Sequence, residues 1–212
     1  MELPHFADLL ARRLEGIIQL SAPQIGQLYS HFVVLLKWNE GINLTSVRSP
    51  EEMITRHYCE SIFFALHLPE ARQGAKIADV GSGAGFPGVP MAVLRPDWQL
   101  TLIESHQRKS VFLRESARVL RNVRVLAERA EVVSEQFDWL VSRAVRAGDV
   151  LAQVPRLSPR VGLLVGESDL PELTAQRTLT WGAPIPIPWS ERRFCVYGEF
   201  HVEQYRNVSR ET

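Results

Sequence analysis

The stretch Lys76-Ile-Ala-Asp-Val-Gly-Ser-Gly-Ala-Gly-Phe-Pro-Gly88 decides the fold of this chain of 212 residues. A short apolar run ends at Val80 and enters a turn containing Gly81, Gly83 and Gly85, after which a helical pattern begins. Glycine adopts positive φ at no steric cost and lets the backbone approach a ligand closely. A strand, a glycine turn and a helix in this order are typical of a parallel α/β sheet that binds a nucleotide-like ligand. We therefore expect these three glycines to lie against such a ligand.

A carboxylate follows the glycine turn at the distance that a nucleoside requires. Glu104 ends the next apolar run, 100–103. An acidic residue roughly 20 residues past the turn is positioned to accept hydrogen bonds from both hydroxyls of a ribose. The sequence therefore predicts a nucleoside-bearing cofactor, with Glu104 at its ribose.

Two cofactors fit the glycine turn. The spacing Gly83-x-Gly85-x-x-Gly88 matches the dinucleotide fingerprint, which leaves an NAD-binding oxidoreductase open. The form Asp79-x-Gly-x-Gly-x-Gly is instead typical of methyltransferases that use S-adenosylmethionine. Pro87 also removes an N–H near the start of the next helix, where a pyrophosphate needs donors. We therefore favour S-adenosylmethionine, which carries no phosphate.

The hydrophobic and charged fractions, 45% and 23%, are those of a globular protein. No apolar run approaches the roughly 20 residues of a membrane span, and the N-terminus shows no export signal. Cys59 and Cys195 are isolated, without metal-ligand spacing. We expect a cytoplasmic protein with no metal and no membrane partner.

Charge is distributed unevenly although the net charge is zero, a balance that argues against indiscriminate coating of nucleic acid. Between His106 and Arg129, basic residues far outnumber the two acids, Glu115 and Glu128: Arg108, Lys109, Arg114, Arg118, Arg121, Arg124 and Arg129. This segment is either a solvated helix face or a patch that contacts phosphates.

Periodicity predicts three helices before the glycine turn, over 6–20, 23–38 and 49–66. Strands and helices alternate after it, with strands near 76–80, 99–103, 123–127, 138–142 and 161–165 and a last, antiparallel one at 193–200. Such alternation predicts parallel strands with right-handed crossovers. We expect a Rossmann-like α/β fold of about seven mostly parallel strands. Residues 1–70 would form a helical cap on a core at 71–212, in one compact domain.

Arginines follow several of the predicted strands. Arg129 comes after the third strand and Arg143 after the fourth, so both would reach the edge where ligands bind in such sheets. Asn43 lies in a polar break between two helices. The sequence contains no Gly-x-Ser-x-Gly elbow and no phosphate-binding P-loop, so hydrolytic chemistry is not indicated.

The N-terminal half resembles one family specifically. Lys37-Trp38-Asn39-x-x-Ile-Asn43-Leu-Thr-Ser46, with Arg56-His57 and Ser61 after it, resembles the signature of the glucose-inhibited division protein B family. The segments 79–88 and Ser142-Arg143-Ala144 resemble its later motifs. The family comprises bacterial small-subunit ribosomal RNA methyltransferases. The resemblance implies a class I methyltransferase fold and transfer of a methyl group to N7 of one guanine in 16S ribosomal RNA.

The resemblance also implies roles for individual residues. It places S-adenosylmethionine against the glycine turn, Phe86, Ala130, Glu131 and Arg143, with Glu104 at the ribose. Three further residues match polar positions around the catalytic pocket and the RNA: Asn43, Arg129 and Arg192. The partner would be 16S ribosomal RNA or the small ribosomal subunit. With no coiled-coil pattern present, we expect a monomer.

Two lysines of the family pattern are missing. Val165-Gly166-Glu167 replaces the usual lysine-glycine after the fifth strand, and Gly198-Glu199 replaces a lysine near the last strand. The lost positive charge keeps a third interpretation open. In that interpretation the chain is an RNA-binding or regulatory module that retains a cofactor site without catalysis.

Overall fold

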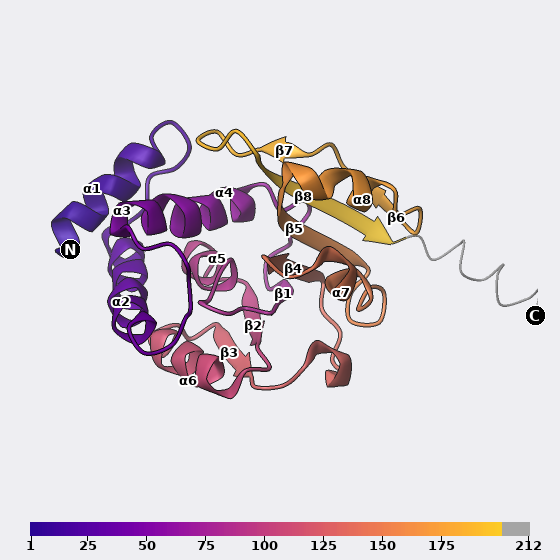
Figure 1. Cartoon of the computed structure of the whole chain (residues 1–212), viewed down its shortest axis with the longest axis horizontal. Coiled ribbons are helices and arrows are strands. Elements are labelled where there is room, and N and C mark those ends of the chain that lie inside the picture. Colours follow the sequence, from indigo (N-terminus) through magenta and orange to yellow (C-terminus); the bar gives the residue numbers. More distant parts are fainter. Residues whose placement is uncertain (201–212) are drawn as a thin grey trace, which may run out of the picture.

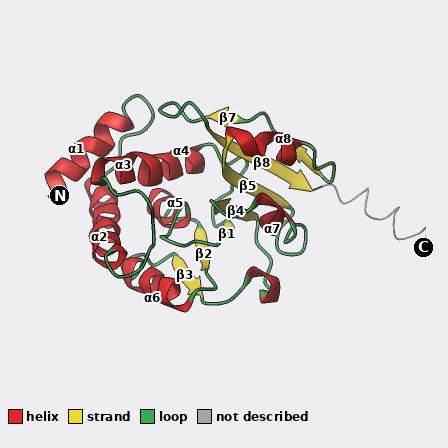
Figure 2. Cartoon of the chain, in the orientation of Figure 1, coloured by secondary structure: helices red, strands yellow, loops and turns green. Residues whose placement is uncertain are grey.

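The computed structural model describes residues 1–200, which form one eight-stranded sheet with helices on both faces (Figures 1 and 2). The order along the sheet is β3-β2-β1-β4-β5-β8-β6, and β7 pairs with β8. The first five strands are mutually parallel: β1 (Lys76–Val80), β2 (Gln99–Ile103), β3 (Val123–Leu126), β4 (Trp139–Arg143) and β5 (Arg160–Gly166). Their carboxyl ends therefore meet at one edge of the sheet, which we call the carboxyl edge.

The last strand runs against the others, as the sequence predicts. β8 (Arg193–Phe200) is antiparallel to β5, with Arg193 opposite Gly166. Its first residue therefore lies at the carboxyl edge. Beyond the predicted strands, the structure adds two short ones on β8, β6 (Leu179–Trp181) and β7 (Ile185–Pro186). The prolines around β7 limit it to two residues, because proline cannot donate to a ladder.

The N-terminal third is helical. α1 (Leu3–Arg13) ends earlier than the periodicity predicts, and Gly16 adopts φ +74° in the turn after it. α2 (Ala22–Asn39) begins at a capping box in which the Ser21 hydroxyl accepts from the Gln24 N–H and the Gln24 side chain accepts from the Ser21 N–H. Both helices lie to the left of the sheet in Figure 1.

The predicted helix over 49–66 is continuous but contains a wider turn. It comprises α3 (Pro50–Met53), a π-helical segment (Ile54–Cys59) and α4 (Glu60–Leu66), and Ser49 caps its first turn by accepting from Glu52 N–H. π-helical turns are rare and occur frequently at functional sites.

Shorter helices cross over between the strands. These are α5 (Gly88–Leu94), α6 (Gln107–Ser116), α7 (Ala147–Leu151) and α8 (Leu170–Thr174), together with single 3₁₀ turns at Ala130–Val132 and Glu167–Asp169. Of these, α5, α6 and α7 connect strands that are parallel neighbours in the sheet, as the alternation predicts, whereas α8 leads from β5 to β6, which pairs with β8.

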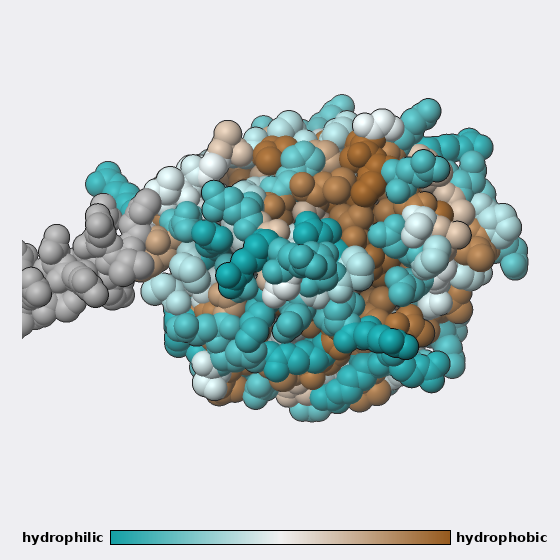
Figure 3. Space-filling model, turned by 180° about the vertical axis from the view of Figure 1, so that it is seen from behind, coloured by the Kyte–Doolittle hydropathy of each residue, from teal (hydrophilic) through white to brown (hydrophobic). Residues whose placement is uncertain are grey.

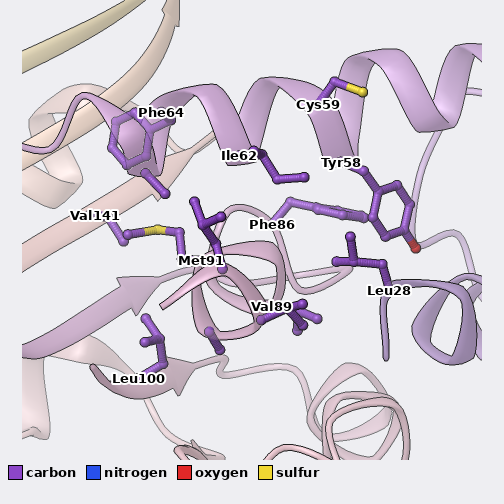
Figure 4. Packing of buried hydrophobic residues seen from close by; sticks show 14 of the residues in the cluster. Leu28, Tyr58, Cys59, Ile62, Phe64, Phe86, Val89, Met91, Leu100 and Val141 are labelled. Atoms are coloured by element: carbon purple, nitrogen blue, oxygen red, sulfur yellow. The ribbon is translucent and has the colours of Figure 1, made fainter. Parts of the chain in front are cut away.

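Two apolar clusters lie on opposite faces of the sheet. The larger joins the N-terminal helices, α5 and α6 to the sheet, and the smaller lies beneath α7 and α8. In the larger cluster Phe86, from the glycine turn, packs against Tyr58 with ring centroids 5.0 Å apart (Figure 4). The N-terminal helices and the glycine turn therefore share one core. The division of the chain at residue 70 stays a prediction.

Polar and apolar side chains are interspersed on the surface. Apolar side chains gather in a strip in the upper half of the face opposite to that of Figure 1, bordered by polar ones (Figure 3). Within residues 1–200, no helix has the length and apolar character needed to cross a membrane.

Candidate functional site

A cavity of about 460 Å³ opens at the carboxyl edge. Five segments line it: the loop 44–47, the π-helical segment, the glycine turn, the end of β2 and the residues 143–145 that follow β4. Arg193 and Lys109 complete the wall. A larger cavity of about 840 Å³ lies between α1 and the start of α2, away from all of these segments. Since α/β sheets bind ligands at the carboxyl edge, the smaller cavity is the candidate site.

The glycine turn forms the floor of the cavity, and its conformation requires glycine. Gly81 has φ +70°, and a Cβ added there would lie 2.5 Å from Cγ2 of Val145. Gly83 also adopts a positive φ, of +53°. The backbone thus comes close to the cavity at positions where a side chain would fill it.

Glu104 is fixed against this turn by backbone hydrogen bonds. Its Oε2 accepts from Gly83 N–H at 2.9 Å, and its Oε1 accepts from His106 N–H at 2.8 Å. A carboxylate has about four lone-pair sites, so each oxygen can accept one further hydrogen bond. The side chain is buried, yet it lines the cavity.

Asp79 supports the turn from below. Its Oδ2 accepts from Gly88 N–H at 3.0 Å, whereas Oδ1 is buried without a partner within residues 1–200. Burial raises the pKa of Asp79 to about 7. A Cβ on Gly88 would lie 2.7 Å from Asp79 Oδ2, so glycine at 88 is needed for this contact.

One wall of the cavity is aromatic. The His57 ring stacks on Phe86, with centroids 4.9 Å apart and an interplanar angle of 24°. Its Nε2 is 2.7 Å from the Thr45 hydroxyl, which also accepts from Val47 N–H. Burial, and then the positive charges of Arg143, Arg56 and Arg193, lower the pKa of His57 to about 3. The imidazole is therefore neutral at pH 7 and a weak base.

A buried carboxylate holds two of the arginines that line the cavity. Glu60 Oε2 lies 3.1 Å from Arg143 Nη2 and 3.0 Å from Arg193 Nε. Arg143 also donates to the carbonyl of Arg56 through Nη1. Burial raises the pKa of Glu60, and Arg143 and Arg193 oppose that shift.

Comparison with known proteins now identifies the family. The family described as rRNA small subunit methyltransferase G (GidB) matches residues 24–178, well over half of the chain. The chain belongs to this family.

Curated relatives carry the same description. The chain is 43% identical over 138 residues to the "Ribosomal RNA small subunit methyltransferase G" of Nitrosomonas eutropha, a match that covers 62% of this chain and 63% of the relative. It is 41% identical over 145 residues to the protein of that name from Pseudomonas aeruginosa, covering 66% of each. The matches thus span slightly less than two thirds of these relatives.

A solved structure shares the fold. A SAM-dependent methyltransferase from Aquifex aeolicus superposes with a TM-score of 0.58 at 13% identity, covering 80% of this chain and 98% of that one. At this identity the likeness concerns the fold alone. It agrees with the predicted Rossmann-like class I architecture.

The structure brings together part of the predicted site of this GidB-family chain. Gly81, Gly83, Phe86, Glu104 and Arg143 all line the cavity, and Gly85 lies in the same turn. The remaining predicted residues are not among those that line it: Asn43, Arg129, Ala130, Glu131 and Arg192. Asn43 is exposed and directly precedes the lining residue Leu44. Arg129 is also exposed, and the 3₁₀ turn that follows it contains buried Ala130 and exposed Glu131. Arg192 is exposed, and its Nε lies 4.0 Å from a carboxylate oxygen of Glu167.

Sequence reasoning missed the roles of Glu60 and Arg193 and quoted His57 only as part of a motif. One signal was available for Glu60. Only Ser61 separates it from the apolar run 62–66, on a helix that begins with two other acids, Glu51 and Glu52, and it is buried whereas they are exposed. Arg193 carries no signal that separates it from Arg192. Arg193 is the first residue of β8 and lines the cavity, whereas Arg192 precedes the strand and is exposed.

The basic segment forms an exposed surface on and after α6. Arg108, Arg114, Arg118, Arg121 and Arg129 are exposed, and within residues 1–200 none of them forms an ion pair. Arg124 pairs with Glu135, and Lys109 is half-buried at the cavity. Both interpretations of this segment, a solvated face and a phosphate-binding patch, are compatible with such a surface.

Proposed function

We propose that the cavity binds S-adenosylmethionine and that the chain transfers its methyl group to N7 of a guanine in 16S ribosomal RNA. The observation that carries the proposal is the position of Glu104. Glu104 directly follows β2, and its carboxylate is held by the N–H groups of Gly83 and His106 and lines the cavity with capacity for further hydrogen bonds. Both hydroxyls of a ribose would find acceptors there.

The residues present fit this cofactor. The space beside Gly83, where an added Cβ would meet only the Gly81 carbonyl oxygen at 3.7 Å, would receive part of the cofactor, and the cofactor would lie beside Phe86. We assign Arg143 to the cofactor's charged end, and Ala130 and Glu131 to its nucleoside end near β3. When bound, S-adenosylmethionine supplies an electrophilic methyl group, and the protein aligns the acceptor with it.

The acceptor that we propose requires little acid–base chemistry from the protein. N7 of guanine carries a free lone pair and need not lose a proton before it reacts. Of the residues that line the cavity, His57 is a weak base, and Glu104 already accepts two backbone hydrogen bonds. A site of this composition suits a lone-pair nucleophile.

The substrate follows from the family. Relatives are described as ribosomal RNA small subunit methyltransferases, and we extend that substrate to this chain. Asn43, Arg129 and Arg192 would then contact the target nucleotide or the flanking RNA. We expect the enzyme to work as a cytoplasmic monomer on 16S ribosomal RNA or on the small subunit.

Transfer of a labelled methyl group tests the proposal. The purified chain and labelled S-adenosylmethionine are incubated with small ribosomal subunits that lack their own N7 methylation. The RNA is then cleaved chemically at 7-methylguanine. We expect one labelled, cleavable guanine in 16S ribosomal RNA.

The other outcomes separate the parts of the proposal. Label on a different base or RNA would keep methyl transfer and reject the substrate. Absence of label, with cofactor binding confirmed by calorimetry, would reject the enzyme in favour of a silent RNA-binding module. Displacement of S-adenosylmethionine by NAD would reject S-adenosylmethionine as the cofactor.

A further inference from the structure

The two arginines that pair with Glu60 differ in their exposure and in how many of their guanidinium nitrogens have partners. Arg143 is nearly enclosed, with 7% of its side chain exposed, and its two terminal nitrogens bind Glu60 and the Arg56 carbonyl. Arg193 contacts Glu60 through an ion pair between Nε and Oε2 at 3.0 Å that lacks hydrogen-bond geometry, and 22% of its side chain is exposed. Within residues 1–200, neither terminal nitrogen of Arg193 donates a hydrogen bond, and Glu60 is its ion-pair partner. Its outer end is therefore available to a ligand.

The surroundings of Arg193 favour an anion. Four cationic side chains line the cavity, namely Arg56, Lys109, Arg143 and Arg193, against one carboxylate, Glu104. Glu60 lies beneath them and neutralises only part of this charge. His57 adds no positive charge because it is neutral. The wall around Arg193 thus carries a net positive charge.

The position of Arg193 indicates which anion fits. Four inter-strand steps separate β2, which Glu104 follows, from β8, which begins at Arg193. At a strand spacing of about 4.8 Å, the two ends of the cavity lie about 19 Å apart along the sheet. A nucleoside cofactor anchored at Glu104 and the glycine turn leaves the β5–β8 end of the cavity for the second reactant.

We propose that Arg193, held in place by the buried Glu60, binds a phosphate of the RNA substrate through its two terminal guanidinium nitrogens. The inference rests on the proposed function and adds a contact on the substrate side. A guanidinium presents its donors as a planar fork that matches two oxygens of a phosphate. Because the ion pair places Nε against Glu60, the outer edge of that fork is turned away from Glu60 before the RNA arrives. Glu60 is in this sense a positioning residue.

A salt titration with matched variants tests the contact. Binding of Arg193→Gln to small subunits lacking N7 methylation is measured by co-sedimentation across a salt series, and binding of S-adenosylmethionine by calorimetry. We expect subunit affinity to fall about tenfold, and the slope of log K against log salt to fall by about one. Affinity for the cofactor should stay within twofold. Arg72→Gln, at the opposite edge beside Asp138, is the control and should change neither quantity.

Two more variants separate positioning from charge. Arg193→Lys keeps the charge without the fork, so it should keep the salt slope and still lose affinity severalfold. Glu60→Gln should weaken subunit binding severalfold and add little to the loss in Arg193→Gln. If Glu60→Gln does not fold, the two Arg193 variants still show whether Arg193 contacts an RNA phosphate.

Three results would overturn the inference. They are an unchanged salt slope in Arg193→Gln, unchanged subunit affinity, or weakened binding of S-adenosylmethionine with normal subunit binding. The last result would indicate that Arg193 binds the carboxylate of S-adenosylmethionine and not a phosphate of the RNA. The test reads binding, so it remains valid if the wild-type chain transfers no methyl group. That result would reject the proposed function alone.

Discussion

Glu104 and Glu60 are both buried carboxylates near the same cavity, but they are held in opposite ways. Backbone N–H groups of Gly83 and His106 bind Glu104, and both lie within 21 residues of it in the sequence. Two guanidinium groups bind Glu60, from Arg143 on β4 and Arg193 on β8. The first is a fixed acceptor in a local turn. The second is one member of a charge cluster built from three distant segments.

The two carboxylates contribute free energy to different processes, Glu104 to ligand binding and Glu60 first to folding. Glu104 keeps its hydrogen-bond partners whatever happens to the arginines, so its value lies in what it offers to a ligand. Glu60 neutralises buried positive charge, so its value lies first in folding and only then in binding. Substitutions at the two positions should therefore separate stability from affinity.

The largest effect is expected from Glu60→Ala. Without the carboxylate, Arg143 remains buried without a counter-charge, and Arg193 loses its anchor. Removing one partner of a buried ion pair costs about 3–5 kcal/mol of the free energy of unfolding. Denaturant unfolding measures this loss. A cost below about 1 kcal/mol would mean that water replaces the carboxylate easily, and the contrast with Glu104 would not hold.

The same contrast explains what sequence could predict. Glu104, Gly81 and Gly83 belong to one strand–turn–helix unit, so their relation is set by spacing along a short segment. The strands β1 and β2 were likewise predicted to the residue. Glu60 and Arg193 are 133 residues apart, and nothing in either local pattern links them. Their contact depends on β8 running antiparallel to β5 and on which side of β8 faces the helix.

An intermediate effect is expected from Glu104→Gln. The variant keeps the shape of the side chain but offers a neutral group to a ribose, and its NH2 cannot accept one of the two backbone N–H bonds. Hydrogen bonds to charged groups contribute about 1.5–3 kcal/mol, so S-adenosylmethionine should bind about 10- to 100-fold more weakly. Calorimetry measures the change. The stability loss should stay well below that of Glu60→Ala.

Glu128→Gln supplies the control for this variant. Glu128 is an exposed acid after β3 that does not line the cavity, so its cofactor affinity should match the wild type. Equal affinities in Glu104→Gln and Glu128→Gln would remove Glu104 from the cofactor site.

The smallest effect is expected from Glu52→Gln, on the same continuous helix as Glu60. Glu52 pairs with Arg56 at 2.8 Å, but both side chains are more than 40% exposed. Exposed pairs of this spacing contribute about 0.3–0.5 kcal/mol. Thermal unfolding at low and high salt measures the loss, which should vanish at high salt. A loss as large as that of Glu60→Ala would show that burial does not distinguish the two acids.

The reversed direction of β8 has a practical consequence for single-molecule and surface-based assays. The strand begins at the cavity with Arg193 and reaches the opposite edge of the sheet at Phe200, whose N–H donates to the Pro159 carbonyl. A dye, a linker or a capture tag attached at that end of β8 therefore lies on the side of the molecule that faces away from the cavity. Immobilising the protein through that end would leave the cavity open to a particle as large as a ribosomal subunit.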